Sequence, residues 1–160
     1  MGLMIAATKE PRIDYRKVAP DVIEAMLGLE ECVTRSGLER SLLHLVKLRA
    51  SQINGCAWCI DMHTKDARAD SETEQRLYLL SVWRESPLFT ERERAALAWT
   101  EAITKLGEDG VPDDVYYYAR EHFTSKELVY LTLAVVAING WNRFNVSMRT
   151  VPGSYQPYSH

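Results

Sequence analysis

The feature that most constrains this chain is the spacing of its apolar residues, which recur three and four positions apart along almost its whole length. That period is typical of α-helices with one buried side, and no stretch alternates strictly for long enough to indicate a strand. We therefore expect an all-α helical bundle. At 160 residues the chain has the usual size of one domain, so we expect a single domain over 1–160, with a core at about 15–151 and irregular termini.

Local end signals divide this pattern into separate helices. Capping boxes are predicted at Ser71-x-x-Glu74, Thr90-x-x-Glu93 and Thr124-x-x-Glu127, where a hydroxyl and a glutamate satisfy the first backbone N–H groups. Asn54-Gly55 predicts a sharp turn, because both residues tolerate left-handed backbone. Pro112 suits a first helical turn. The expected helices run over 21–36, 39–53, 56–69, 71–83, 90–106, 112–122 and 124–147.

Charge and hydropathy exclude several partners. The net charge is −3, with no run of like charges that could bind phosphates, so no nucleic acid is expected. The Met1–Ala7 segment lacks the basic and apolar regions of a signal peptide. The most apolar run, Leu128–Ile138, is far shorter than the roughly 20 residues that span a bilayer. We expect a cytoplasmic protein with no membrane partner.

Two of the three cysteines stand close together, in Cys56-Ala57-Trp58-Cys59. An odd number of cysteines does not make the disulfide framework of a secreted domain, and in a reducing compartment Cys-x-x-Cys indicates redox chemistry or metal binding. Cys32 is interpreted as a packing residue. Trp58 is a candidate pocket residue, and Trp141 is a candidate for a pocket wall or a subunit interface.

The candidate site combines this pair with two histidines. Cys56, Cys59 and His63 follow at spacings of three and four, which places them along one stripe of a helix. The N-terminus of that helix would stabilise a thiolate, and His63 could act as its base. The turn at Asn54-Gly55 brings the preceding helix back, so that His44 could face the site. The same four residues, with two sulfurs and two nitrogens, would also suit tetrahedral zinc.

The segment Leu45–Ala67, with its sequence LVKLRASQINGCAWCIDMHTKDA, resembles the alkylhydroperoxidase AhpD-like branch of the carboxymuconolactone decarboxylase superfamily. The resemblance extends more loosely from Tyr15 to about Val151 and includes 88–95 and 138–143. It implies an all-helical fold that assembles into homo-trimers or hexamers. It also implies a dithiol peroxidase that needs no cofactor or metal, takes a hydroperoxide as its substrate and is reset by a thiol reductant.

Individual roles follow from the same resemblance. Cys59 would attack the peroxide, Cys56 would form the disulfide with it, and His63 would help to remove the thiol proton. The family usually has a glutamate twelve positions before the first cysteine, where this chain has His44. Two alternatives stay open: a zinc-bound or redox-sensing interaction module, and a decarboxylase of the carboxymuconolactone type, which needs no cysteines.

Overall fold

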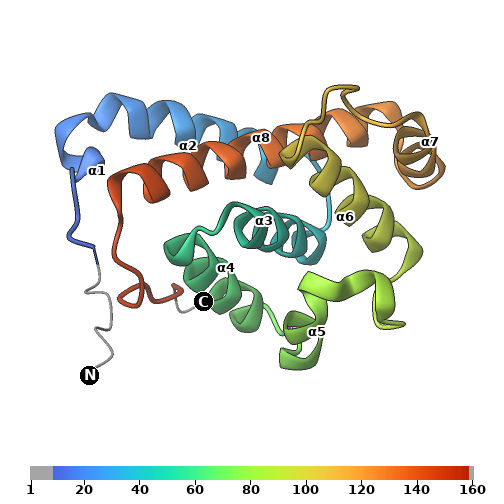
Figure 1. Ribbon diagram of the computed structural model, residues 1–160, viewed down its shortest axis with the longest axis horizontal. Coiled ribbons are helices and arrows are strands. Elements are labelled where there is room, and N and C mark those ends of the chain that lie inside the picture. The colour runs from blue at the N-terminus through green and yellow to red at the C-terminus, as the bar shows by residue number, and fades with distance from the viewer. Residues whose placement is uncertain (1–8, 159–160) are drawn as a thin grey trace, which may run out of the picture.

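The structure, a computed structural model, describes residues 9–158, and every regular element in that range is a helix, which confirms the all-α prediction (Figure 1). Among these helices, none combines the length and apolar character needed to cross a membrane. The expectations that rest on Met1–Ala7 lie outside the described residues. The elements are α1 Tyr15–Val18, α2 Pro20–Thr34, α3 Arg40–Asn54, α4 Ala57–Ala69, α5 Glu74–Leu79, the 3-10 helix η1 Leu80–Glu85, α6 Glu91–Thr104, α7 Asp113–His122 and α8 Ser125–Met148.

Two of the three predicted capping boxes are confirmed. The hydroxyls of Thr90 and Thr124 each accept a hydrogen bond from the backbone N–H three residues on, and the glutamate there accepts one from the cap's own N–H. The box predicted at Ser71 is wrong, because Ser71 has left-handed backbone with φ 71° and belongs to the turn after α4. Thr73 caps α5 instead and accepts from the N–H of Arg76.

Helix α3 lies at the centre of the molecule, where it contacts α4, α6 and α8 (Figure 1). Its buried side chains contribute to two apolar clusters. Val46 belongs to one cluster together with Leu131 of α8, and Leu48 belongs to the other together with Leu97 of α6. All four side chains are at most 1% exposed. Helix α3 is therefore packed into both clusters, and this packing fixes the position of the turn at Gly55 that follows it.

Helices α2 and α8 run side by side along one edge of the molecule (Figure 1). Gly140 permits this approach, since a Cβ atom at that position would lie 2.9 Å from Cε of Met26 in α2. The next residue, Trp141, donates from Nε1 to Oε1 of Glu30 over 3.2 Å. The close pairing therefore brings a polar and an aromatic side chain of the two helices together.

After α8 the chain is irregular over 149–158, as the sequence indicates, and it turns back along α4. Gly153 donates its backbone N–H to Asp61 over 3.1 Å, and Nζ of Lys65 donates to the backbone carbonyl of Tyr155 over 2.9 Å. Asp61 and Lys65 lie one turn apart on α4. The C-terminal segment is thus fixed to the helix that carries the cysteine pair.

Candidate functional site

The turn between α3 and α4 sets the position of both cysteines. Gly55 has the predicted left-handed backbone, with φ 64°, and the N–H of Cys56 donates to the carbonyl of Ser51 over 3.0 Å. Cys56 is the N-cap of α4, and its Sγ accepts a hydrogen bond from the N–H of Cys59 over 3.3 Å. The unpaired N–H groups and the positive end of the helix dipole therefore lie at the sulfurs.

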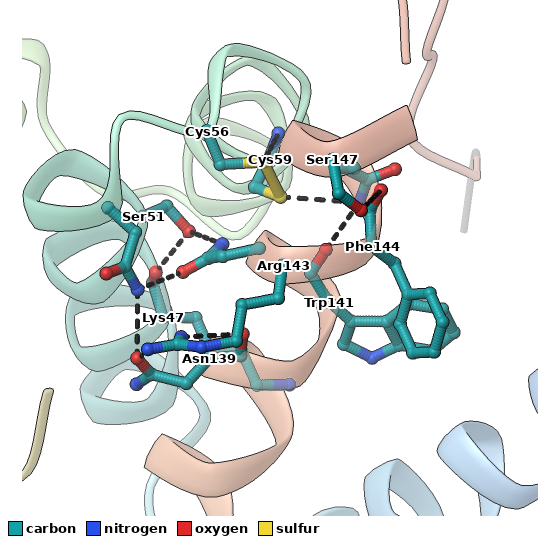
Figure 2. The surroundings of a disulfide bond; sticks show 12 residues. Lys47, Ser51, Cys56, Cys59, Asn139, Trp141, Arg143, Phe144 and Ser147 are labelled. Carbon is teal, nitrogen blue, oxygen red and sulfur yellow. Dashed lines mark hydrogen bonds between the residues drawn. A yellow bond between two sulfur atoms is a disulfide. The ribbon is translucent and has the colours of Figure 1, made fainter. Parts of the chain in front are cut away.

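Cys56 and Cys59 are joined in a disulfide, with their Cα atoms 5.3 Å apart. Figure 2 shows this bond between the start of α4 and α8, with Ser51 of α3 and Trp141 of α8 nearby. Each cysteine is 1% exposed. The site is thus in its oxidised form, and the same two sulfurs are thiols when the bond is reduced.

Helix α8 supplies a polar contact to the disulfide. Nδ2 of Asn145 lies 3.4 Å from Sγ of Cys59 and also donates to the carbonyl of Trp141, while its Oδ1 accepts from the hydroxyl of Tyr15 over 3.0 Å. Asn145 is only 3% exposed. Because each polar atom of this buried amide has a partner, its Nδ2 is held in one orientation, toward Cys59.

A cleft of about 810 Å³ is lined by one of the two cysteines of the disulfide. Cys59 lines it together with His63 and His44, whereas Cys56 is absent from the lining. The structure therefore brings together three of the four predicted site residues in one cavity, with the fourth bonded behind Cys59. The full lining is Arg16, Ile23, Leu27, Glu30, Thr34, Leu38, Arg40, Leu43, His44, Lys47, Trp58, Cys59, Met62, His63, Asp66, Trp141, Tyr155 and Tyr158.

His63 lies one turn after Cys59 on α4 and is 8% exposed. Burial, and after it the positive charges of Lys47 and His44, lowers the pKa of His63 from 6.5 to about 3. The imidazole is therefore neutral at physiological pH while the disulfide is intact. A neutral imidazole has a free nitrogen lone pair that can accept a proton.

His44 has a carboxylate partner. Its Nε2 lies 2.5 Å from Oδ2 of Asp70, and the same oxygen accepts from Nε of Arg40 over 2.6 Å. Within residues 9–158 no group of three or more His, Cys, Asp or Glu side chains is placed to hold a metal ion. In this oxidised form His44 is bound to Asp70 and the two sulfurs are bonded to each other; zinc binding by the reduced pair, the alternative considered from the sequence, stays a prediction.

Sequence reasoning missed several members of this site. Lys47 lies one turn after His44 on α3, so the helical period could have found it. Asp70 lies opposite His44 across the Asn54-Gly55 turn, and the register of an antiparallel pair could have suggested it. Asn145 and Tyr155 reach the site only through tertiary packing, and no local pattern marks them. The predicted pocket residues Trp58 and Trp141 do line the cleft.

Fold and site together define an all-helical protein with a disulfide at a helix start, open to a cleft on one side. Comparison with known proteins agrees with this class. The sequence pattern of the carboxymuconolactone decarboxylase family matches residues 20–102. The uncharacterized protein YdfG of Bacillus subtilis is 42% identical over 137 residues, which is 86% of this chain and 93% of that protein. The chain belongs to the carboxymuconolactone decarboxylase family.

Solved structures support its position within that family. A protein of unknown function from Agrobacterium tumefaciens, provisionally described as an antioxidant defence protein AhpD, is 49% identical with a TM-score of 0.87, covering 91% of this chain and 100% of that chain. This confirms the resemblance to the AhpD-like branch. The debrominase Bmp8, at 18% identity and a TM-score of 0.77, covers 86% of this chain and 74% of that chain and shares the fold.

Proposed function

We propose that the protein is a dithiol peroxidase that reduces organic hydroperoxides and is reset by external thiols. The observation that carries this proposal is the asymmetry of the cysteine pair. Cys59 lines the cleft beside His63, and Cys56 lies behind it within disulfide distance. A substrate in the cleft would therefore meet the sulfur of Cys59 first, with a second sulfur in place to react with the product.

The reaction balances without a cofactor. The Cys59 thiolate attacks the terminal oxygen of ROOH, the O–O bond breaks, and the alkoxide takes a proton and leaves as ROH, with Cys59 now a sulfenic acid. The Cys56 sulfur then attacks Sγ of Cys59 and displaces water, which forms the disulfide. Two molecules of an external thiol reduce this disulfide to the dithiol and become oxidised to a disulfide themselves.

Several surrounding groups favour the thiolate on which the first step depends. The start of α4 directs its N–H groups and dipole at the sulfurs, and Nδ2 of Asn145 can donate to Sγ of Cys59. The Lys47 ammonium, paired with Glu30, lines the same cleft as Cys59 and His63. We assign to His63 the uptake of the thiol proton, because a thiolate beside it raises the pKa of an imidazole. His44, held by Asp70, would pass that proton on.

The decisive experiment is to count thiols on reduced, purified protein before and after one equivalent of cumene hydroperoxide. We expect the wild type to lose two thiols as one molecule of alcohol forms. Cys56→Ser should lose one thiol and accumulate a sulfenic acid, and Cys59→Ser should lose none in the same time. Cys32→Ser serves as the matched control and should behave as the wild type. No peroxide-dependent loss in the wild type would refute the proposal.

Two broader expectations accompany this function: a cytoplasmic location and a homo-trimer or hexamer. The oligomer is supported by apolar side chains on the outside of α8, where Val129 is 69% and Val136 is 51% exposed. These two residues are seven positions apart and so lie on the same side of the helix. Light scattering on the purified protein would give the subunit number, and a monomer at micromolar concentration would contradict this expectation.

A further inference from the structure

The C-terminal segment forms part of the wall of the cleft that contains Cys59. Tyr155 and Tyr158 both line this cleft, although they are nearly a hundred positions from the cysteines in sequence. Tyr155 is held by two contacts to α4: its hydroxyl donates to Oδ1 of Asp66 over 2.6 Å, and its carbonyl accepts from Lys65 over 2.9 Å. Side chain and backbone are thus both fixed, which makes the segment a constant part of the cavity.

Tyr155 continues an aromatic surface that begins beside the disulfide. Its ring centroid lies 6.1 Å from that of Trp58 in an edge-to-face arrangement, and Trp58 immediately precedes Cys59. The guanidinium of Arg16 lies 4.5 Å from the centroid of the Trp58 ring and restrains it further. Two mutually oriented rings therefore present one continuous aromatic wall next to the reactive sulfur.

The charged groups of the cleft are largely paired with one another. Lys47 bonds to Glu30 over 2.6 Å and His44 bonds to Asp70 over 2.5 Å. Burial, and after it the hydrogen bond to Asp66, raises the pKa of Tyr155, so its hydroxyl stays protonated. These pairings leave no large excess of one charge sign in the cleft. Its chemistry therefore suits a neutral ligand with an apolar body.

We propose that the wall formed by Trp58 and Tyr155 determines specificity by selecting neutral hydroperoxides that carry an aromatic ring. This inference rests on the proposed peroxidase function and adds a recognition role for Tyr155, which takes no part in the redox steps. A phenyl group can pack face to face with one ring and edge to face with the other and displace water from them, whereas a methyl group in its place leaves most of that surface uncovered. Both compounds are tertiary hydroperoxides that would oxidise the same sulfur of Cys59, so the comparison probes recognition of the phenyl group.

The test compares cumene hydroperoxide with tert-butyl hydroperoxide, since the two differ in one phenyl against one methyl group. We expect the wild type to favour the phenyl compound in kcat/KM by about tenfold or more. Tyr155→Ala should remove most of this preference, because kcat/KM falls far more for cumene hydroperoxide than for tert-butyl hydroperoxide. Tyr155→Phe keeps the ring and should keep the preference. Tyr117→Ala, on the exposed side of α7, is the matched control and should be unchanged.

A binding measurement separates this inference from the peroxidase proposal. Calorimetric titration of the oxidised protein with cumyl alcohol, the expected product, reports recognition without any chemistry. We expect cumyl alcohol to bind the wild type more tightly than tert-butyl alcohol, and Tyr155→Ala to remove the difference. If both hydroperoxides consume thiols at the same rate, in the wild type and in Tyr155→Ala alike, the aromatic wall is refuted while the peroxidase stands. If no thiol is lost but Tyr155-dependent binding persists, the peroxidase is refuted and the recognition wall stands.

Discussion

The burial of a neutral His63 makes a specific prediction about acid stability. The pKa of this imidazole is about 3 in the folded protein and about 6.5 in the unfolded chain. Between pH 7 and pH 5 the folded protein takes up almost no proton at His63, whereas the unfolded chain takes up about 0.7 of a proton. A depressed folded pKa of this kind contributes stability that is present above pH 6.5 and is lost as the pH falls. Integration of the linkage relation gives a loss of about 2 kcal/mol between pH 7 and pH 5.

The assay is urea denaturation of the oxidised protein at pH 7, 6 and 5, for the wild type and for His63→Gln. Other titrating groups are common to both proteins and cancel in the comparison. We expect the wild type to lose about 2 kcal/mol more than His63→Gln over this range. His122→Gln, which removes a histidine from α7 and leaves His63 in place, should behave as the wild type. Equal losses in wild type and His63→Gln would refute the reasoning.

Three further changes probe the surroundings of the disulfide and the core. Lys47→Met should slow alkylation of Cys59 in the reduced protein at pH 7 by about fivefold, because a nearby positive charge favours the thiolate; an unchanged rate would exclude that role. Asn145→Ala should cost about 1–3 kcal/mol in urea denaturation, because it leaves the hydroxyl of Tyr15 buried without its partner; adding Tyr15→Phe should recover part of the loss. Burial raises the pKa of Glu101, but hydrogen bonds from two arginines and a tryptophan outweigh it and lower the net pKa. The ionised Glu101 therefore stabilises the folded protein above about pH 4.5, and this stabilisation is lost in acid. Glu101→Gln should lower the free energy of unfolding by about 2 kcal/mol at pH 7 and by much less at pH 3.

The part of the site that the sequence predicts is the part made by local structure. Asn54-Gly55 fixes a turn, and the spacing of Cys56, Cys59 and His63 fixes one helical stripe, so these residues could be assigned without a structure. The capping boxes at Thr90 and Thr124 succeed for the same reason. The box at Ser71 fails because tertiary turns compete with local signals: Ser71 takes left-handed backbone to end one helix, and the next cap moves to Thr73.

The rest of the site depends on packing between distant segments. Asn145 lies on a helix whose pattern is apolar and buried, and its contact to Cys59 exists because α8 packs on α4. Tyr155 follows a proline and a glycine that indicate only an irregular segment. The sequence alone does not tell where such a segment lies. Its contacts to Asp66 and Lys65 become apparent only in three dimensions.

The position of Tyr155 has a consequence for how members of this family can diverge. Cys56, Cys59, His44 and His63 lie within residues 20–102, the stretch that matches the family pattern, as does Trp58, whereas Tyr155 lies outside it. On the proposed function, the redox groups share one stretch of the chain, and the recognition wall takes only one of its two rings, Tyr155, from outside that stretch. Substitutions in the C-terminal stretch can accumulate without disturbing the turn that aligns the sulfurs. On the proposed function, a change at position 155 would alter which substrate binds and leave the geometry of the sulfurs as it is.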